Sequence, residues 1–151
     1  MKVEQLMKRE VVSCKPETDL AAVALMMWQH DCGSVPITDA NDHPVGMITD
    51  RDISIAGATR SCPLSEIRAS NVKDGDVVSI HPGQDINDAL GLMSAAQVRR
   101  LPVVDDADRL VGILSVSDIV ARLPQGGAGA SASGLSQEQV IDTLRSIIQH
   151  H

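Results

Sequence analysis

Aromatic side chains are almost absent from this sequence. Its 151 residues include one tryptophan, Trp28, and no phenylalanine or tyrosine. Proteins that hold single-stranded nucleic acid stack the bases on aromatic side chains, so the composition argues against that class. Basic residues are also few: 13 Lys and Arg against 20 Asp and Glu give a formal net charge of −7, which does not suit binding to a phosphate backbone. The core must consist of aliphatic residues and methionine.

Long hydrophobic runs are missing as well. No apolar stretch reaches the ~18 residues that a membrane-spanning helix needs, and the N-terminus has no apolar signal-peptide region. The cysteines Cys14, Cys32 and Cys62 are odd in number and far apart, which argues against a disulfide framework or a zinc site. Free thiols suit a reducing compartment, so we expect a cytoplasmic protein. One reactive thiol is the alternative to three small, partly buried side chains.

What the sequence does have is an internal repeat with a spacing of 66 residues. Without a gap, residues 3–56 align with residues 69–122. The alignment places like residues on like, as in the pairs Pro16 and Pro82, Pro36 and Pro102, Gly46 and Gly112, and Asp52 and Asp118. Two copies indicate a domain with pseudo-twofold symmetry, in which the halves bury each other's apolar faces.

Both copies predict the same order of elements: strand, helix, strand, strand, helix. In the first copy we expect strands at 11–14, 35–38 and 45–48, a turn at 39–42 and a final helix whose opening residues are 51–56. Its first helix carries an apolar stripe of Leu20, Val23, Ala24, Met27 and Trp28. Thr18 or Asp19 is the expected N-cap, and Gly33 the expected left-handed residue after the helix. The second copy predicts strands at 77–80, 101–104 and 110–114, a helix that buries Ile86, Ala89, Leu90 and Met93, and a last helix to 123.

The composition changes after Pro124. Residues 125–134 are almost all Gly, Ala and Ser, which is typical of a flexible linker. Ser136 and Gln139 then form a capping box for an amphipathic helix. Its apolar face consists of Val140, Ile141, Leu144, Ile147 and Ile148 and needs a partner surface, on this module, a second subunit or another protein. His150 and His151 are either native or the remnant of a tag. The predicted divisions are residues 1–60, 61–124, 125–134 and 135–151.

Two equivalent segments could bind a ligand. Residues 46–52 and 112–118 each leave a strand, present a hydroxyl and reach an aspartate as a helix begins. A helix N-terminus favours an anion such as phosphate, and an Asp can accept hydrogen bonds from the paired hydroxyls of a ribose. The alternative is that Asp52 and Asp118 simply cap their helices.

The doubled unit resembles a tandem cystathionine-β-synthase (CBS) domain pair, or Bateman module, and is similar to stand-alone bacterial proteins that are little more than one such pair. The resemblance spans about residues 3–123. It rests on the opening Val3, Leu6 and Met7, on Val11-Val12-Ser13-x-x-Pro16, on the strands with Pro36 and Pro102, and on both endings of the form Gly-apolar-apolar-Ser/Thr-x-x-Asp. It implies an α/β (α+β) fold of two β-α-β-β-α repeats related by a pseudo-twofold axis, followed by a C-terminal helix.

The resemblance also implies regulation rather than catalysis. Such modules bind adenosine compounds, namely AMP, ADP, ATP, S-adenosylmethionine or a dinucleotide, in a cleft between the repeats, and commonly form flat homodimers. Carried over to this sequence, one pocket has Thr49, Arg51 and Asp52 with Ser79, Val98, Arg99 and Arg100. The other has Ser115, Ser117 and Asp118 with Ser13, Gly33, Ser34 and Val35.

The two predicted pockets differ in charge. The first gathers Arg51, Arg99 and Arg100, and guanidinium groups bind phosphate in a bidentate manner, whereas the second has no cation among its matched positions. We therefore expect a phosphorylated adenosine in the first pocket and weaker binding, or a less charged ligand, in the second. The alternative is that Arg99 and Arg100 pair with surface carboxylates.

Other functions have less support in the sequence. Residues 39–50 begin like a calcium loop, but Pro44 and Asp50 replace its glycine and glutamate. His30, His43 and His81 lack the spacing of metal ligands, and no pairing of residues supports a catalytic nucleophile. We thus expect no metal, no required cofactor, no membrane or nucleic-acid partner and no enzyme activity. A dimerising module that recruits a partner without any ligand is the alternative function.

Overall fold

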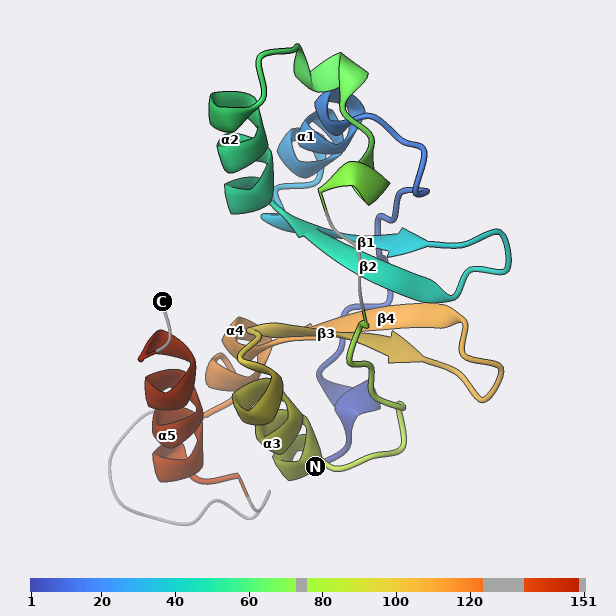
Figure 1. Ribbon diagram of the computed structural model, residues 1–151. Helices are drawn as coiled ribbons and strands as arrows, with labels where there is room; N and C mark the ends of the chain where they lie inside the picture. Colours follow the sequence, from blue (N-terminus) through green and yellow to red (C-terminus); the bar gives the residue numbers. More distant parts are fainter. Residues whose placement is uncertain (73–75, 124–134, 150–151) are drawn as a thin grey trace. The chain divides into compact units, whose positions relative to one another are not determined.

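The structure is a computed structural model that describes residues 1–72, 76–123 and 135–149. Figure 1 shows its elements, which are the 3₁₀ helices η1 (Val3–Gln5), η2 (Leu64–Glu66) and η3 (Ala69–Asn71), the helices α1 (Leu20–Gln29), α2 (Asp50–Thr59), α3 (Ile86–Ala96), α4 (Val116–Val120) and α5 (Gln137–Ile148), and the strands β1 (Ser34–Thr38), β2 (Pro44–Thr49), β3 (Arg100–Val104) and β4 (Leu110–Ser115). The predicted linker at 125–134 and the residues His150 and His151 lie outside the described residues.

The chain packs as two compact units. We call residues 11–77 with 108–110 the first-repeat unit, and residues 1–10, 78–107 and 111 onward the second-repeat unit. Strands β1 and β2 form a two-stranded sheet, as do β3 and β4. Each unit has its own core, and the buried side chains of both cores are aliphatic, methionine or cysteine, as the lack of aromatic residues requires.

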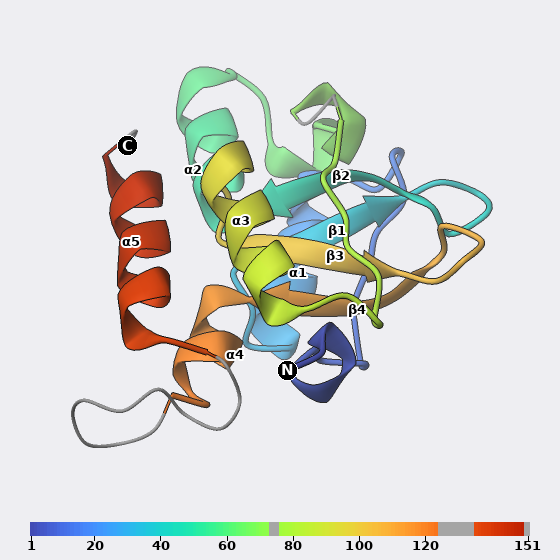
Figure 2. The ribbon, with the colours of Figure 1, turned by 90° about the horizontal axis from the view of Figure 1, so that it is seen from below.

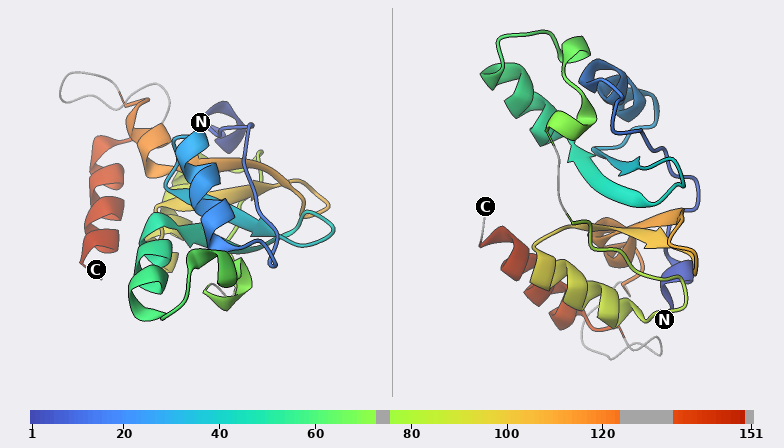
Figure 3. Two further views of the ribbon diagram at one scale, coloured as in Figure 1. Left: turned by 90° about the horizontal axis from the view of Figure 1, so that it is seen from above. Right: turned by 45° about the vertical axis from the view of Figure 1, so that its right-hand side comes forward.

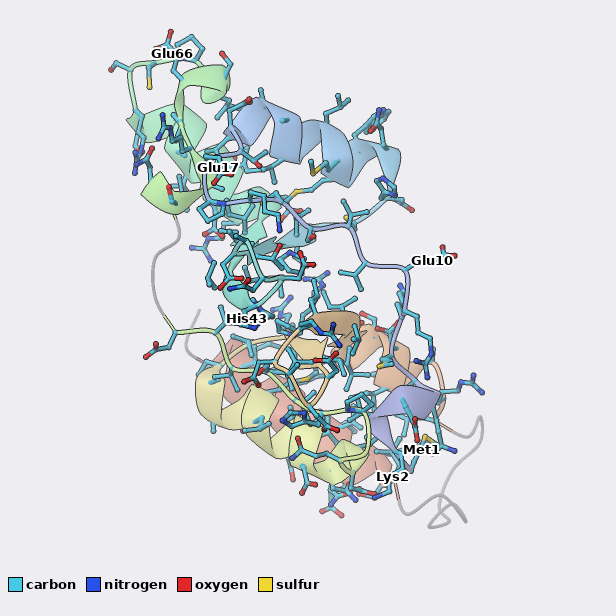
Figure 4. The ribbon with its side chains drawn as sticks, turned by 90° about the vertical axis from the view of Figure 1, so that its right-hand side faces the viewer. Met1, Lys2, Glu10, Glu17, His43 and Glu66 are labelled. Carbon is cyan, nitrogen blue, oxygen red and sulfur yellow. The ribbon has the colours of Figure 1, made fainter. Side chains whose placement is uncertain are left out.

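The leading segment of each repeat packs in the unit formed mainly by the other repeat. Although η1 opens the first repeat, Val3 is fully buried in the core of the second-repeat unit, and its N–H donates to the Gln84 carbonyl at 3.0 Å. Figure 4 shows Met1 and Lys2 beside η1 in this unit. Conversely, η3 opens the second repeat, yet the Ala69 N–H donates to the Thr18 carbonyl at 2.8 Å in the first-repeat unit. The packing units therefore differ from the sequence repeats at their N-terminal ends.

The first predicted strand of each repeat is only a single-residue bridge. In the first-repeat unit Cys14 pairs in parallel with Ile37 of β1: its N–H donates to Pro36, and its carbonyl accepts from Thr38, both at 2.9 Å. Extending this ladder would need N–H groups at Pro16 and Pro36, and proline has none. In the second-repeat unit Ile80 pairs with Val103 in the same way. The strand predictions for 11–14 and 77–80 were thus too long, because these prolines limit the pairing.

The predicted buried stripe of helix α1 is confirmed for most of its residues but is wrong for Trp28. Leu20, Val23 and Met27 are buried, whereas the Trp28 side chain is 84% exposed. A step of one residue turns a helix by about 100°, so Trp28 points well away from the direction in which Met27 is buried. The Asp19 carboxylate, and not the Thr18 hydroxyl, caps this helix, since it accepts from the Ala22 N–H at 2.9 Å.

Two other helix ends differ from the prediction. Asp31, with φ of 47°, takes the left-handed conformation after α1 that was expected at Gly33. Helix α1 ends at Gln29, so the left-handed residue falls at Asp31, and aspartate tolerates this conformation. Helix α4 ends at Val120, so the prediction of a helix to 123 was too long. The predicted turn at 39–42 is confirmed: the Asp39 carboxylate accepts from the N–H groups of Asn41 at 2.8 Å and His43 at 2.9 Å.

The C-terminal helix α5 packs on the second-repeat unit. The predicted capping box is present, and the Ser136 hydroxyl accepts from the Gln139 N–H at 3.1 Å. Val140 and Ile147 are buried in the core of this unit, which also contains α3. Ile141 and Ile148 are 47% and 58% exposed, so they do not belong to the buried face as predicted. Among the three partner surfaces considered from the sequence, the structure shows the module itself.

Candidate ligand-binding sites

The first candidate site lies where β2 joins α2 in the first-repeat unit. Thr49 is the N-cap of α2, and its hydroxyl accepts from the Asp52 N–H at 3.2 Å. The Asp52 Oδ2 atom in turn accepts from the Thr49 N–H at 2.9 Å and from the Thr49 hydroxyl at 2.8 Å. This reciprocal capping box fixes the orientation of the carboxylate at the start of the helix. The capping role expected as the alternative is therefore real, and it also prepositions a hydrogen-bond acceptor.

The second candidate site has the same geometry where β4 joins α4. The Asp118 Oδ2 atom accepts from the Ser115 N–H at 2.9 Å and from the Ser115 hydroxyl at 2.5 Å. The Ser115 hydroxyl accepts from the Asp118 N–H at 3.2 Å. Both aspartates are partly buried. The repeat thus reproduces a hydroxyl–carboxylate pair at each strand-to-helix junction.

The second site has a cation that the sequence comparison of the two pockets missed. The Lys8 Nζ atom lies 3.5 Å from Asp118 Oδ1. Lys8 is held beside β4 because its N–H and carbonyl both pair with Ile113 at 2.9 Å. Its side chain is 70% exposed, so the ammonium group is hydrated and able to move. Lys8 comes close to Asp118 because the leading segment of the first repeat packs in the second-repeat unit. The repeat alignment gives no sign of this packing, so the sequence did not identify Lys8 as a neighbour.

The start of β1 adjoins the first junction within the same unit. Ser34 pairs with Thr49 in the antiparallel register, and the Asp50 N–H donates to the Gly33 carbonyl at 3.1 Å. A Cβ atom at Gly33 would lie 3.2 Å from the Asp50 carboxylate, so a side chain here would require Asp50 to shift slightly. In the second-repeat unit the Val116 N–H likewise donates to the Arg99 carbonyl at 3.0 Å.

The structure places the predicted site residues in two sets. The first-repeat unit holds Ser13, Gly33, Ser34, Val35, Thr49, Arg51 and Asp52, and the second-repeat unit holds Ser79, Val98, Arg99, Arg100, Ser115, Ser117 and Asp118. Within a unit, residues predicted for different pockets lie side by side, as Ser34 and Thr49 do. The grouping of residues from both units into one pocket stays a prediction.

The arginines predicted for the first pocket carry no carboxylate partner in the part of the chain that the structure describes. None of the ion pairs among those residues involves Arg51, Arg99 or Arg100. Arg51 and Arg99 are exposed, and Arg100 is half-buried at the start of β3. The alternative in which Arg99 and Arg100 pair with surface carboxylates therefore gains no support from these ion pairs.

The loop at 39–43, which resembles the start of a calcium loop in sequence, is contacted by the ammonium group of Lys15. The Lys15 Nζ atom donates to the Thr38 hydroxyl at 3.1 Å, to the Asp39 carbonyl at 2.8 Å and to Asp42 Oδ1 at 3.0 Å. Figure 4 labels His43, which belongs to this same loop between β1 and β2. Lys15 thus holds the loop between β1 and β2 closed. Across the described residues, no three His, Cys, Asp or Glu side chains form a group that could hold a metal ion.

The three thiols are free, and they differ in exposure. Cys14 is buried, Cys32 is half-buried and Cys62 is exposed. Burial raises the pKa of the Cys14 thiol to about 11, so it stays protonated at neutral pH and is a poor nucleophile. Of the helices described, none has the length and apolar character to span a membrane.

Comparison with known proteins gives matches along most of the chain. The family model described as "CBS domain" matches residues 3–58 and 69–125. The uncharacterised protein MK0525 of Methanopyrus kandleri is 32% identical over 78% of this chain, and the match spans 60% of that protein. Hypoxic response protein 1 of Mycobacterium tuberculosis is 36% identical over 76% of this chain and 80% of its own length.

Solved structures agree with these matches. The crystal structure of Hypoxic Response Protein I, described with two coordinated zinc ions, has a TM-score of 0.73 and 32% identity, and covers 82% of this chain and 100% of its own. The CBS domain pair of MJ0100, solved in complex with 5-methylthioadenosine and S-adenosyl-L-methionine, has a TM-score of 0.70 and 25% identity. It covers 80% of this chain and 98% of its own. These likenesses show that the mixed helix and strand fold of this chain is that of a CBS-domain pair.

Proposed function

We propose a regulatory role for this chain, which belongs to the CBS-domain family: it binds an adenosine-containing nucleotide with side chains from both repeats. The observation that carries the proposal is the pair of equivalent junctions, each with an aspartate held by a capping hydroxyl at a helix start. The ligands of the MJ0100 domain pair, 5-methylthioadenosine and S-adenosyl-L-methionine, both contain adenosine. AMP, ADP and ATP are the expected ligands here, and S-adenosylmethionine or a dinucleotide is the further option.

The proposed role of Asp52 and Asp118 is to accept hydrogen bonds from ribose hydroxyls. A carboxylate offers about four acceptor positions, so a helix cap at one oxygen is compatible with a ligand at the same group. No aromatic residue other than the exposed Trp28 is present. Aliphatic side chains such as the half-buried Val98 would therefore contact the adenine, whereas the Val35 side chain is fully buried in the core of the first-repeat unit. The hydroxyls of Thr49 and Ser115 take part in the helix caps, and we propose that they help to bind the ligand and have no catalytic role.

The proposed difference between the two pockets is one of cation type. Arg51, Arg99 and Arg100 would bind phosphate in the first pocket, and guanidinium groups do so through two parallel hydrogen bonds. The second pocket has the Lys8 ammonium 3.5 Å from Asp118, which is a single, strongly hydrated charge. We therefore propose that a phosphorylated adenosine binds more tightly in the first pocket than in the second.

Calorimetric titration of AMP and ATP into the wild type and Arg100→Ala tests this proposal. Loss of a charged hydrogen bond costs about 1.5–3 kcal/mol, so we expect roughly 10- to 150-fold weaker binding of the tighter nucleotide. Arg145→Ala is the matched control, because Arg145 lies on α5, pairs with Asp142 at 3.3 Å and has no proposed contact with the ligand. Equal affinity of all three proteins would contradict the role of Arg100.

A ligand-independent dimerising module is the second candidate function. It is favoured by the exposed apolar residues Leu25 and Trp28 of α1, which are 54% and 84% exposed. Thermal unfolding with a panel of adenosine compounds separates the two functions. A failure of every compound to raise the melting temperature at millimolar concentration would favour this second function. In either case we propose a homodimer, acting in the cytoplasm where its free thiols stay reduced.

A further inference from the structure

Gln97, the C-cap residue of α3, takes a left-handed backbone conformation with φ of 56° and ψ of 39°. The 66-residue alignment matches it with Asp31, which follows α1 and has φ of 47°. Glycine, asparagine and aspartate tolerate this conformation, whereas it is uncommon for a residue with a longer side chain. The second repeat therefore has a glutamine where the backbone favours a shorter residue, and the reach of that side chain distinguishes the two repeats at this position.

The Gln97 side chain reaches the C-terminal helix. Its Nε2 atom donates to the Ser94 carbonyl at 2.6 Å and to the Ser146 hydroxyl of α5 at 2.9 Å. Its Oε1 atom is buried and has no hydrogen-bond partner among the residues that the structure describes. Both the left-handed backbone and a buried acceptor without a partner cost free energy. Residues held in this way cluster at ligand clamps and switch regions, which makes Gln97 a candidate for such a role.

The chain that follows Gln97 is the segment proposed to bind the nucleotide. Val98 packs against the core of the second-repeat unit, which includes buried residues of α5. The Arg99 carbonyl accepts from the Val116 N–H at 3.0 Å, and this hydrogen bond ties the segment to the start of α4. Arg100 then opens β3. The path of residues 98–100 therefore depends on α5 through Gln97 and Val98, and on α4 through Arg99.

Helix α5 lies alongside α3, as Figures 2 and 3 show, and it also contacts α4. Val140 and Ile147 anchor it, because both are buried in the core of the second-repeat unit. Between α3 and α5 an open groove remains, and most of the residues that line it are polar: Asn87, Ser94, Gln139, Asp142 and Thr143. The hydrogen bond between Gln97 and Ser146 therefore adds to an interface that apolar packing only partly fills.

We propose that Gln97 and Ser146 are positioning residues for the nucleotide site, and that docked α5 holds residues 98–100 in the conformation that binds phosphate. Nucleotide binding and α5 docking then stabilise each other, because a coupling free energy between two equilibria acts equally in both directions. This inference rests on the proposed function and deepens it, since it makes α5 the element that regulates the site and responds to its occupancy.

Calorimetric titration of the wild type, Gln97→Gly, Ser146→Ala and the double variant tests the proposal, with AMP or ATP, whichever the wild type binds more tightly. Glycine adopts the left-handed conformation freely, so Gln97→Gly keeps the backbone path and removes the side-chain contact. We expect about 2- to 10-fold weaker binding for each single variant, which corresponds to one neutral hydrogen bond. The double variant should lose no more than either single variant, because both changes remove the same contact.

Thr143→Val is the matched control for these variants. Thr143 is a buried residue of α5, and its hydroxyl donates within the helix to the Gln139 carbonyl at 2.9 Å. The change removes a hydroxyl from the same helix without removing the contact with Gln97, so we expect wild-type affinity. Affinity equal to wild type in Gln97→Gly and Ser146→Ala, or an equal loss in Thr143→Val, would overturn the inference and leave the proposed function standing. A wild type that binds neither nucleotide would instead contradict the proposed function itself.

Amide hydrogen exchange measures the same coupling in the other direction. Saturating nucleotide should slow exchange in α5 of the wild type, because binding stabilises its docked position, and should slow it less in Gln97→Gly. Exchange in α1, which belongs to the first-repeat unit, is the internal comparison for a general stabilisation of the fold. Exchange in α5 that does not respond to the nucleotide, or that slows equally in the wild type and Gln97→Gly, would contradict the coupling.

Discussion

The substitution Asp52→Ala separates the two roles of this carboxylate, which are helix capping and ligand binding. In the unliganded protein the change removes two hydrogen bonds at Oδ2, from the Thr49 N–H at 2.9 Å and from the Thr49 hydroxyl at 2.8 Å. Asp52 is the third helical residue of the capping box, and loss of its hydrogen bonds to the N-cap Thr49 costs about 1 kcal/mol. For a chain of this size that corresponds to a decrease of about 2–4 °C in the melting temperature.

The effect on ligand binding should be larger than the effect on stability. If Asp52 accepts hydrogen bonds from ribose, its removal costs about 1.5–3 kcal/mol per charged hydrogen bond, or roughly 10- to 150-fold in Kd. The two effects have different causes, so they can be measured separately. Chemical unfolding of the unliganded protein gives the capping contribution, and calorimetry with AMP below the melting range gives the binding contribution.

Asp19→Ala is the matched control for this experiment. The Asp19 carboxylate caps α1 in the same unit, through a 2.9 Å hydrogen bond from the Ala22 N–H, and it has no proposed contact with the ligand. We expect a similar loss of stability, about 1 kcal/mol, with unchanged AMP affinity. If Asp52→Ala and Asp19→Ala bind AMP equally well, Asp52 is only a helix cap and the ribose role is wrong.

Two further predictions concern the second-repeat unit. Gly112→Ala should destabilise the fold by about 1–3 kcal/mol in urea unfolding, because the new Cβ would lie 3.1 Å from the backbone oxygen of Lys8; stability equal to wild type would show that this segment shifts freely. The Asn87 N–H, followed by the Met1 ammonium, lowers the pKa of Asp85 from 3.8. Its charged form therefore stabilises the fold above that pH, and the stabilisation is lost as the pH falls through the lower, folded-state value. Asp85→Asn should reduce stability at pH 6 and have less effect in acid, and a pH-independent difference would argue against this cause.

The repeat alignment predicted the helices well because periodic burial is a local property. Ile86, Ala89, Leu90 and Met93 are all buried on α3, as their spacing indicates. The aspartate caps were also predictable, since an N-cap depends on residues within one turn of the helix. Trp28 shows the limit of this reasoning. Its apolar character extends the stripe in the sequence, but only packing decides which side of an apolar helix faces the core.

The first strands were predicted at full length because a run such as Val11–Val12 favours extended structure. Their actual extent depends on which N–H groups face the neighbouring strand. Pro16 and Pro36 were visible in the sequence, but their effect appears only once Cys14 is known to pair with Ile37. The strand propensity of a segment can be judged from its own residues. Which N–H groups it needs for pairing can be judged only after the register with its partner strand is known.

The site residues illustrate the same limit at longer range. Alignment of the repeats identifies equivalent positions, and the paired junctions at Asp52 and Asp118 follow from it. It does not identify neighbours that come from another segment of the chain. Lys8 reaches Asp118 because the leading segment of the first repeat pairs with β4 in the second-repeat unit. A count of the charges within the second repeat therefore omits Lys8, the cation beside Asp118. The two proposed pockets then differ in the kind of cation, with arginine guanidinium groups in the first and a lysine ammonium group in the second, and not in whether a cation is present.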